Sequence, residues 1–284
     1  FPIPIKLINK KNGGQSSARN LGAKLSKTRF ISFLDQDDMV YPQKNKVLKK
    51  SLVEALIKDP SCCYSYGDVT RINEKDSILE NKFSSNRETA ISNNKNSFNF
   101  ETKKYIYKDL YRLVGSALFI RDKFLDSGGF DNNLVGYEDD DLFLNLHLSK
   151  YTFKKVNDEV LFWRLNRFST SYTDTFKISR FNYFKKLVKI FKNKDFQFIE
   201  LILSRFISRF FIDIFIPIFK IFYCRGNVFR SMKASIEILK ESKLLIMQIT
   251  KKLSKKKYNK FLFFFRVLII NKLFYFFKLT KLVL

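Results

Sequence analysis

The fold is decided by the stretch Phe30-Ile31-Ser32-Phe33-Leu34-Asp35-Gln36-Asp37-Asp38. Its apolar first half, rich in Ile and Phe, predicts a short buried strand. Its carboxylates follow at the carboxyl end of that strand, where open α/β sheets bind their ligands. Carboxylates this close repel one another unless a cation neutralises them, and a divalent metal with oxygen ligands is the natural candidate. The alternative is a solvated acidic turn before a helix that has Pro42 in its first turn.

The composition describes a globular chain of 284 residues, which suits one large domain or one domain with an appendage. Hydrophobic residues make up 45% of it, enough to bury a core. Its three cysteines, among them the neighbours Cys62 and Cys63, form no disulfide framework and favour a reducing compartment. His147 is the single histidine, which excludes a His-rich zinc site. The chain starts at Phe1 without a signal peptide, and we expect it to have lost its N-terminus.

The formal net charge of +26 is unevenly placed. From residue 176 to the end there are 25 Lys and Arg against 5 Asp and Glu. Anionic membrane and nucleic acid are the partners that such a basic tail favours. Its aromatic residues lie in apolar stretches with Leu and Ile, unlike the stacking platforms of nucleic-acid-binding proteins, so we expect the membrane and no nucleic acid.

The first part of the chain alternates predicted strands and helices, the pattern of βαβ units with a mainly parallel sheet. We expect strands over 3–9, 29–34, 62–69, 116–120 and 159–164, and helices over 15–27, 43–58 and from 138 onward. The polar segment 70–101 is long for a loop and predicts a mobile or functional excursion.

The second part, residues 176–284, predicts basic amphipathic helices. The stretches 196–224 and 261–284 are apolar but interrupted by charges, so neither offers a clean membrane span. Arg205, Arg209 and Asp213 share one helical face. Helices lying in the membrane interface fit this pattern, and helices packing on the first domain are the alternative. We therefore predict two domains, 1–175 and 176–284.

Four motifs occur in a fixed order and carry a family resemblance. They are Asn12-Gly13-Gly14-Gln15-Ser16-Ser17-Ala18-Arg19-Asn20-Leu21-Gly22-Ala23, Phe33 to Asp38, Gly128-Gly129-Phe130-Asp131, and Glu138-Asp139-Asp140-Asp141-Leu142. This succession resembles the family 2 glycosyltransferases, inverting enzymes of the GT-A fold, over residues 5–171. The resemblance implies an α/β nucleotide-diphospho-sugar transferase fold: a mixed, mainly parallel sheet flanked by helices, with its first strand or strands missing, followed by the basic helical appendage.

The resemblance also implies donor and metal sites. Asp35-Gln36-Asp37 matches the family's DXD element, with Asp37 and Asp35 holding Mg²⁺ or Mn²⁺ and Asp35 nearer the nucleotide. Asp38 is a further support or a solvated neighbour, and we favour the second. Nucleotide-sugar binding is expected from Arg19, Asn20, Asp35, Gly115, Ser116 and Arg164. Asp68 is a further candidate at the rim, with a merely structural place at the end of a strand as the alternative. Asn166 replaces the histidine that the family often carries after Arg164.

The second acidic cluster matches the family's ED pair. Asp139 is the expected general base, with Glu138 beside it, because inverting transfer needs a carboxylate to take the acceptor's proton. Adjacent acids raise one another's pKa, which suits a base. The alternative is structural, since acidic residues are also favoured at helix N-termini.

Together these features predict a metal-assisted, inverting glycosyltransferase. It would move a sugar from a nucleotide-diphosphate donor to a hydroxyl of a cell-surface glycan or lipid-linked saccharide. We expect it in the cytoplasm, on the inner face of the cell membrane. A catalytically inactive membrane-bound scaffold is the alternative, and a basic nucleic-acid-binding protein is a more distant one.

Overall fold

The computed structural model describes residues 4–87, 102–103, 105–106, 110–166, 174–191 and 193, and the positions 198–199, 201–202, 205–206 and 209. The chain divides into two compact units. The first comprises residues 1–91 and 110–171, and the second comprises 92–109 and 172–284. The boundary between 175 and 176 stays a prediction of the sequence.

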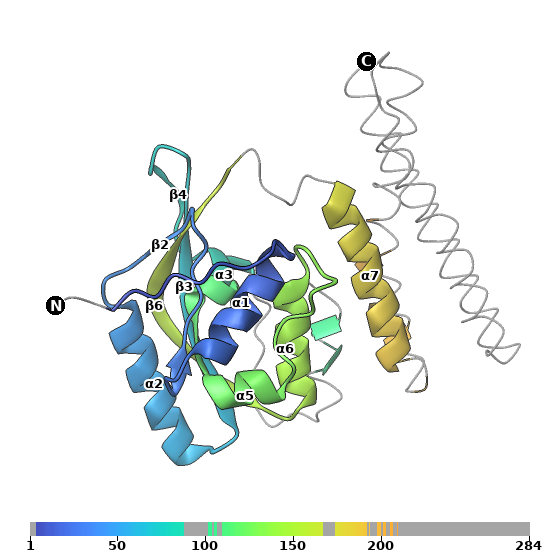
Figure 1. Ribbon diagram of the computed structural model, residues 1–284, viewed down its shortest axis with the longest axis horizontal. Coiled ribbons are helices and arrows are strands. Elements are labelled where there is room, and N and C mark those ends of the chain that lie inside the picture. Colours follow the sequence, from blue (N-terminus) through green and yellow to red (C-terminus); the bar gives the residue numbers. More distant parts are fainter. Residues whose placement is uncertain are drawn as a thin grey trace, which may run out of the picture. The chain divides into compact units, whose positions relative to one another are not determined.

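A six-stranded sheet forms the centre of the first unit, in the order β1-β5-β3-β6-β2, with β4 paired to β3 (Figure 1). The strands are β1 (Phe30–Ile31), β2 (Met39–Val40), β3 (Cys62–Ile72), β4 (Ile78–Glu80), β5 (Ala117–Ile120) and β6 (Thr152–Arg164). Every residue of β3 except Arg71 is buried, as expected of a central strand covered on both faces.

The mixed α/β class is confirmed, whereas a mainly parallel sheet is wrong for the described strands. Only β3 and β6 pair in parallel there, although this is the longest pairing; the other four pairs are antiparallel. Two consecutive strands pair in parallel only when the connection between them carries the chain back to the end of the sheet at which the first strand began. The long excursion from residue 73 to 116 instead brings β5 back in the opposite direction.

Helices cover both faces of the sheet. Figure 1 shows α2 (Lys44–Lys58) on one side, and α1 (Gly14–Leu25), α5 (Arg121–Asp126) and α6 (Glu138–Leu148) on the other. Leu48 and Leu52, one turn apart on α2, pack with the buried residues Cys62, Leu118, Ile120 and Val160. The helices predicted over 15–27, over 43–58 and from 138 are confirmed within two residues at their described ends.

An aromatic cluster fills the other face and anchors the acidic stretch. The ring of Phe33, only 9% exposed, lies 5.3 Å from the rings of Phe124 and Phe130 and 5.9 Å from that of Phe119. The neighbouring Leu34 is 52% exposed. Phe33 therefore fixes the point from which Asp35 to Asp38 leave the core.

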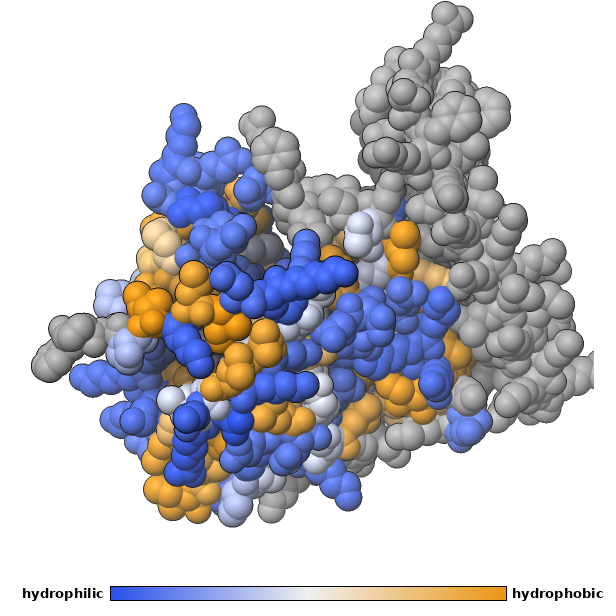
Figure 2. Space-filling model, in the orientation of Figure 1, coloured by the Kyte–Doolittle hydropathy of each residue, from blue (hydrophilic) through white to orange (hydrophobic). Residues whose placement is uncertain are grey.

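Two predicted segments differ from the structure. The strand expected over 3–9 is wrong for the described residues 4–9, which form no strand and leave Ile5 93% and Leu7 84% exposed. Their alternating pattern finds no neighbouring strand in the described sheet. Hydrophilic and hydrophobic patches alternate on the described surface (Figure 2). The segment expected to be a loop from 70 instead continues β3 to Ile72 and forms β4 and α3 (Phe83–Arg87); residues 88–101 lie outside the description.

The described part of the second unit is an aromatic-rich helical packing. Helix α7 (Asp174–Phe191) buries Phe184 and Phe191. Their rings lie 5.6 Å from that of Phe206 and 5.0 Å from that of Phe198. The apolar face of α7 is thus used within its own unit. The stretch 261–284 and most of 196–224 lie outside the described residues.

We found no helix in the described ranges with the length and apolar character needed to cross a bilayer.

We predict that Phe33→Ala lowers the free energy of unfolding by about 3 kcal/mol, because it removes a buried ring from the aromatic cluster. The matched control is Leu34→Ala, which should change stability by less than about 0.5 kcal/mol because Leu34 is exposed. Urea unfolding of both variants measures the difference. Equal losses in the two variants would contradict the anchoring role of Phe33.

Candidate active site

Arg19 brings three acidic side chains together. It lies on α1, and its Nη2 donates to Asp35 Oδ1 at 2.5 Å. Its Nη1 lies 3.4 Å from Glu138 Oε1 and 3.5 Å from Asp139 Oδ1, both at the start of α6. Burial alone would lower the pKa of Arg19, but the charges of Asp139, Asp35 and Glu138 outweigh it and raise that pKa. One guanidinium therefore joins the α1, DXD and ED motifs.

Glu138 is a fully engaged support. Its side chain is only 5% exposed and accepts hydrogen bonds from Gln15 Nε2 and the backbone N–H of Gly136. Gly136 has φ of +97°, a conformation that favours glycine. Both oxygens of Glu138 are thus occupied, so this carboxylate suits positioning more than proton transfer.

Asp139 has the properties of a base. Its Oδ2 accepts the backbone N–H of Val114 at 3.0 Å, while its Oδ1 has no hydrogen-bond donor among the described residues. Burial, reinforced by the charge of Glu138, raises the pKa of Asp139 to about 7, against the opposing effects of Arg19 and the Val114 N–H. A carboxylate with a pKa near neutrality can both take and hold a proton at physiological pH.

Asp38 is a support of the acidic loop. Its Oδ1 accepts the backbone N–H of Arg164 at 3.0 Å, at the end of β6. Burial raises the pKa of Asp38 to about 7, although this hydrogen bond opposes the shift. Our preference for a solvated neighbour is therefore wrong, because the return of β6 beside the loop covers this side chain.

Arg164 lies against the same loop. Its guanidinium donates to the backbone carbonyls of Asp37, at 2.9 Å, and Asn73, at 3.0 Å, and pairs with Asp76 at 2.5 Å. These bonds connect the acidic loop to the turn between β3 and β4. Its predicted contact with the donor stays a prediction.

Asn20 and the glycine turn hold each other. The Asn20 side-chain amide donates to Phe130 O at 2.8 Å and accepts from Phe130 N at 2.9 Å. A Cβ on Gly129, whose φ is +64°, would lie 2.6 Å from Asn20 Oδ1. The absence of a side chain at Gly129 thus lets the backbone of the glycine turn lie directly against the side chain of Asn20. Donor binding by Asn20 stays a prediction.

Gly115 and Ser116 lie in the buried 3-10 turn η1 (Val114–Ser116). The carbonyl oxygen of Gly115 accepts a hydrogen bond from Lys44 Nζ at 2.6 Å. Ser116 Oγ donates a hydrogen bond to the carbonyl oxygen of Leu113 at 2.8 Å. A Cβ on Gly115 would lie 3.1 Å from Leu161 Cδ2, so the two residues are in close contact. Their role toward donor or acceptor remains a prediction.

Asp35 and Asp37 fit a metal that arrives with its phosphate ligand. Asp35 is 47% exposed at its side chain, and Asp37 is exposed. No set of three or more His, Cys, Asp or Glu within the described ranges could hold a metal ion by itself. Mg²⁺ is commonly held by one or two carboxylates together with substrate phosphates, so this donor set is compatible with it.

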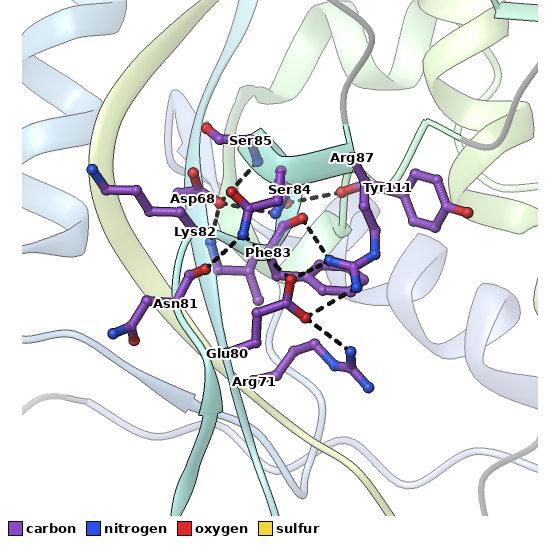
Figure 3. A network of polar contacts seen from close by, with 12 residues as sticks. Asp68, Arg71, Glu80, Asn81, Lys82, Phe83, Ser84, Ser85, Arg87 and Tyr111 are labelled. Atoms are coloured by element: carbon purple, nitrogen blue, oxygen red, sulfur yellow. Dashed lines mark hydrogen bonds and ion pairs between the residues drawn. The ribbon is translucent and has the colours of Figure 1, made fainter.

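Asp68 organises the excursion after β3 (Figure 3). Its Oδ1 accepts the backbone N–H groups of Val69, Ser84 and Ser85 at 2.8, 2.9 and 3.3 Å. Nearby, Glu80 pairs with Arg71 at 3.0 Å and with Arg87 at 2.6 Å, and hydrogen bonds from Arg87 lower the pKa of Glu80 to about 2. Asp68 is 1% exposed, so the prediction that it lies at an open rim is wrong. It instead holds the backbone at the start of α3 through Ser84 and Ser85.

Comparison with known proteins identifies the family of the chain. Residues 5–200, more than half of the chain, match the family described as glycosyltransferase-like family 2. The chain belongs to this family. Membership supports a transferase that handles a glycosyl group.

Several individual proteins are similar to shorter segments of this family 2 glycosyltransferase-like chain. An uncharacterized glycosyltransferase of Rickettsia conorii is 36% identical over 27% of this chain and 12% of its own length. One of Methanocaldococcus jannaschii is 24% identical over 57% of this chain and half of its own length. The minor teichoic acid biosynthesis protein GgaB of Bacillus subtilis is 52% identical over 14% of this chain and 4% of its own length. The matched segments span half or less of these relatives.

Three residues that the site uses were not among the predicted site residues. Gln15 and Val114 donate to Glu138 and Asp139, and Lys44 is 3% exposed beneath η1. Only Lys44 carried a usable signal: it precedes Leu48 and Leu52 at four-residue spacing, which places a lysine on the buried stripe of α2.

Proposed function

We propose that this family 2 glycosyltransferase moves a sugar, with inversion, from a nucleotide-diphosphate donor to a hydroxyl of a cell-surface glycan or lipid-linked saccharide. The observation that carries the proposal is the Arg19 contact with Asp35, Glu138 and Asp139. It brings together a basic group, an exposed carboxylate loop and a carboxylate with a raised pKa. A base that takes the acceptor's proton and groups that stabilise the developing charge of the donor both favour transfer from an anionic donor to a hydroxyl.

In this mechanism Asp139 takes the proton from the acceptor hydroxyl as that oxygen attacks the anomeric carbon. Oδ2 is held by the Val114 N–H, whereas Oδ1 accepts no hydrogen bond among the described groups and lies 3.5 Å from Arg19 Nη1. Oδ1 becomes the receiving atom once Arg19 turns to the donor phosphates. Glu138 and Gln15 hold the start of α6 in place. Arg19 keeps Asp139 ionised in part and turns toward the donor phosphates when they bind.

We assign Asp37, with Asp35, to a bound Mg²⁺ or Mn²⁺. Such an ion, held by these two residues, would neutralise the charge that develops on the departing diphosphate. Asp35 would share its carboxylate between the ion and Arg19, while Asp37 offers an exposed side chain. Asp38 and Arg164 hold the loop from below.

We place the enzyme in the cytoplasm, on the inner face of the membrane. The support is the basic excess from residue 176 onward, which favours an anionic surface. Because α7 uses its apolar face within its own unit, the membrane contact is assigned to the chain beyond residue 209. The similarity to GgaB, a minor teichoic acid biosynthesis protein, supports an acceptor in a cell-surface polymer.

Asp139→Asn should leave a folded protein that binds donor but loses turnover by about 10²- to 10⁴-fold, the usual contribution of a general base. The base must be deprotonated, so wild-type kcat/KM should rise with pH through about 7 and then level off. The measurement is release of nucleoside diphosphate from a panel of UDP-, GDP- and dTDP-linked hexoses. Asp140→Asn is the control, because Asp140 lies on the same turn of α6. This variant should keep the wild-type dependence of kcat/KM on pH. Undiminished turnover in Asp139→Asn would remove the base assignment.

Asp37→Asn should weaken Mn²⁺-dependent donor binding, because one of the two assigned carboxylates loses its charge. Calorimetric titration with UDP in the presence of Mn²⁺ should show at least a tenfold weaker affinity, about 1.4 kcal/mol, than in the wild type. Asp122→Asn, an exposed carboxylate on α5, is the control. Unchanged UDP affinity in the Asp37 variant would argue against this metal site.

The full chain should sediment with vesicles that contain phosphatidylglycerol and not with phosphatidylcholine alone. Binding should weaken as salt rises toward about 0.5 M, because the lysines then lose their attraction to the lipid charge. A chain ending at Ser171 should stay in the supernatant. Its continued sedimentation would contradict docking through the tail.

A further inference from the structure

Lys44 is a lysine in a place where lysine is costly. It is the first residue of α2 and only 3% exposed, whereas lysines are almost never fully buried without a partner. A positive charge in the first turn of a helix also opposes the helix dipole. Burial lowers the pKa of Lys44 to about 8, with the charge of Asp38 opposing the shift. Leu48 and Leu52 show that an apolar side chain suits this stripe.

Its contact explains what the lysine does. The Lys44 ammonium donates to the carbonyl of Gly115 at 2.6 Å, in the middle of η1. The preceding residue of the same turn, Val114, donates its N–H to Asp139 Oδ2 at 3.0 Å. Leu161 on β6 closes the other side of Gly115. The turn is thus held between a cation, a strand and the carboxylate of Asp139.

We infer that Lys44 is a positioning residue for glycosyl transfer: it fixes η1 so that the Val114 N–H holds Oδ2 of Asp139 and thereby orients its carboxylate. The inference rests on the proposed function, because it assigns a purpose to the Asp139 geometry. The Lys44 ammonium binds the carbonyl of Gly115, the peptide between Val114 and Gly115 follows, and the N–H of Val114 binds the carboxylate of Asp139. Lys44 itself contacts neither donor nor acceptor.

The favourable charge next to Lys44 is that of Asp38, in the loop that carries Asp37. The lysine thus interacts electrostatically with the loop assigned to the metal and by a hydrogen bond with the turn that holds the base. A neutral side chain of the same length would keep the packing of α2 but lose this connection.

The test is Lys44→Met in the full chain, with Lys46→Met on the exposed side of the same helix as the control. Two quantities are measured: the pH titration of the Asp139 carboxyl carbon by NMR, assigned with Asp139→Asn, and nucleoside diphosphate release from the same UDP-, GDP- and dTDP-hexose panel. In Lys44→Met the pKa of Asp139 should rise by about half a unit or more, because its hydrogen bond to Val114 loosens. Turnover per folded molecule should fall about tenfold or more, with the donor KM little changed.

Lys46→Met should alter neither quantity. An unchanged Asp139 titration in Lys44→Met would overturn the inference, even if turnover fell, because the route through η1 would then be absent. A shifted titration with full turnover would overturn it as well. Full activity of Asp139→Asn would instead remove the proposed base, a separate result obtained from a separate variant.

Discussion

The site depends on one electrostatic constraint: carboxylates gathered from two distant segments need a cation among them. Asp35 follows β1, and Glu138 and Asp139 open α6, so without Arg19 the fold would bring like charges together with little compensation. The three contacts place α1, the acidic loop and α6 in one arrangement. A charge network that is partly buried also favours one geometry over others, because each partner left alone would pay the cost of desolvation.

This arrangement separates the roles of the acidic residues. Glu138 has both oxygens engaged, Asp38 is bonded to the end of β6, and Asp37 remains exposed. Asp139 is intermediate, with one oxygen held and a raised pKa. These carboxylates thus differ in solvation and partners, and the proposed roles of support, ion binding and proton transfer follow from those differences.

Sequence reasoning predicted the elements that carry their own signal. The stripe of Leu48 and Leu52 located α2, and the apolar run from Cys62 located β3. It could not predict that β5 would run antiparallel to β1 and β3, because strand direction depends on the path of the chain between strands. The exposed residues Ile5 and Leu7 alternate like a strand, but a strand exists only where a neighbour supplies hydrogen bonds.

Within the site, residue types were easier to predict than their partners. The motifs identified Arg19, Asp35 and Asp139, which the structure does bring together. They could not show that Asp68 binds backbone N–H groups or that Asp38 is covered, because both depend on where later segments return. Lys44 is the instructive exception. A lysine on an apolar stripe conflicts with local preference, and such conflicts are expected where a site requires a residue that stability alone would not select. The same reasoning applies to Asp139, whose burial beside Glu138 opposes its own ionisation and thereby gives it the proton affinity of a base.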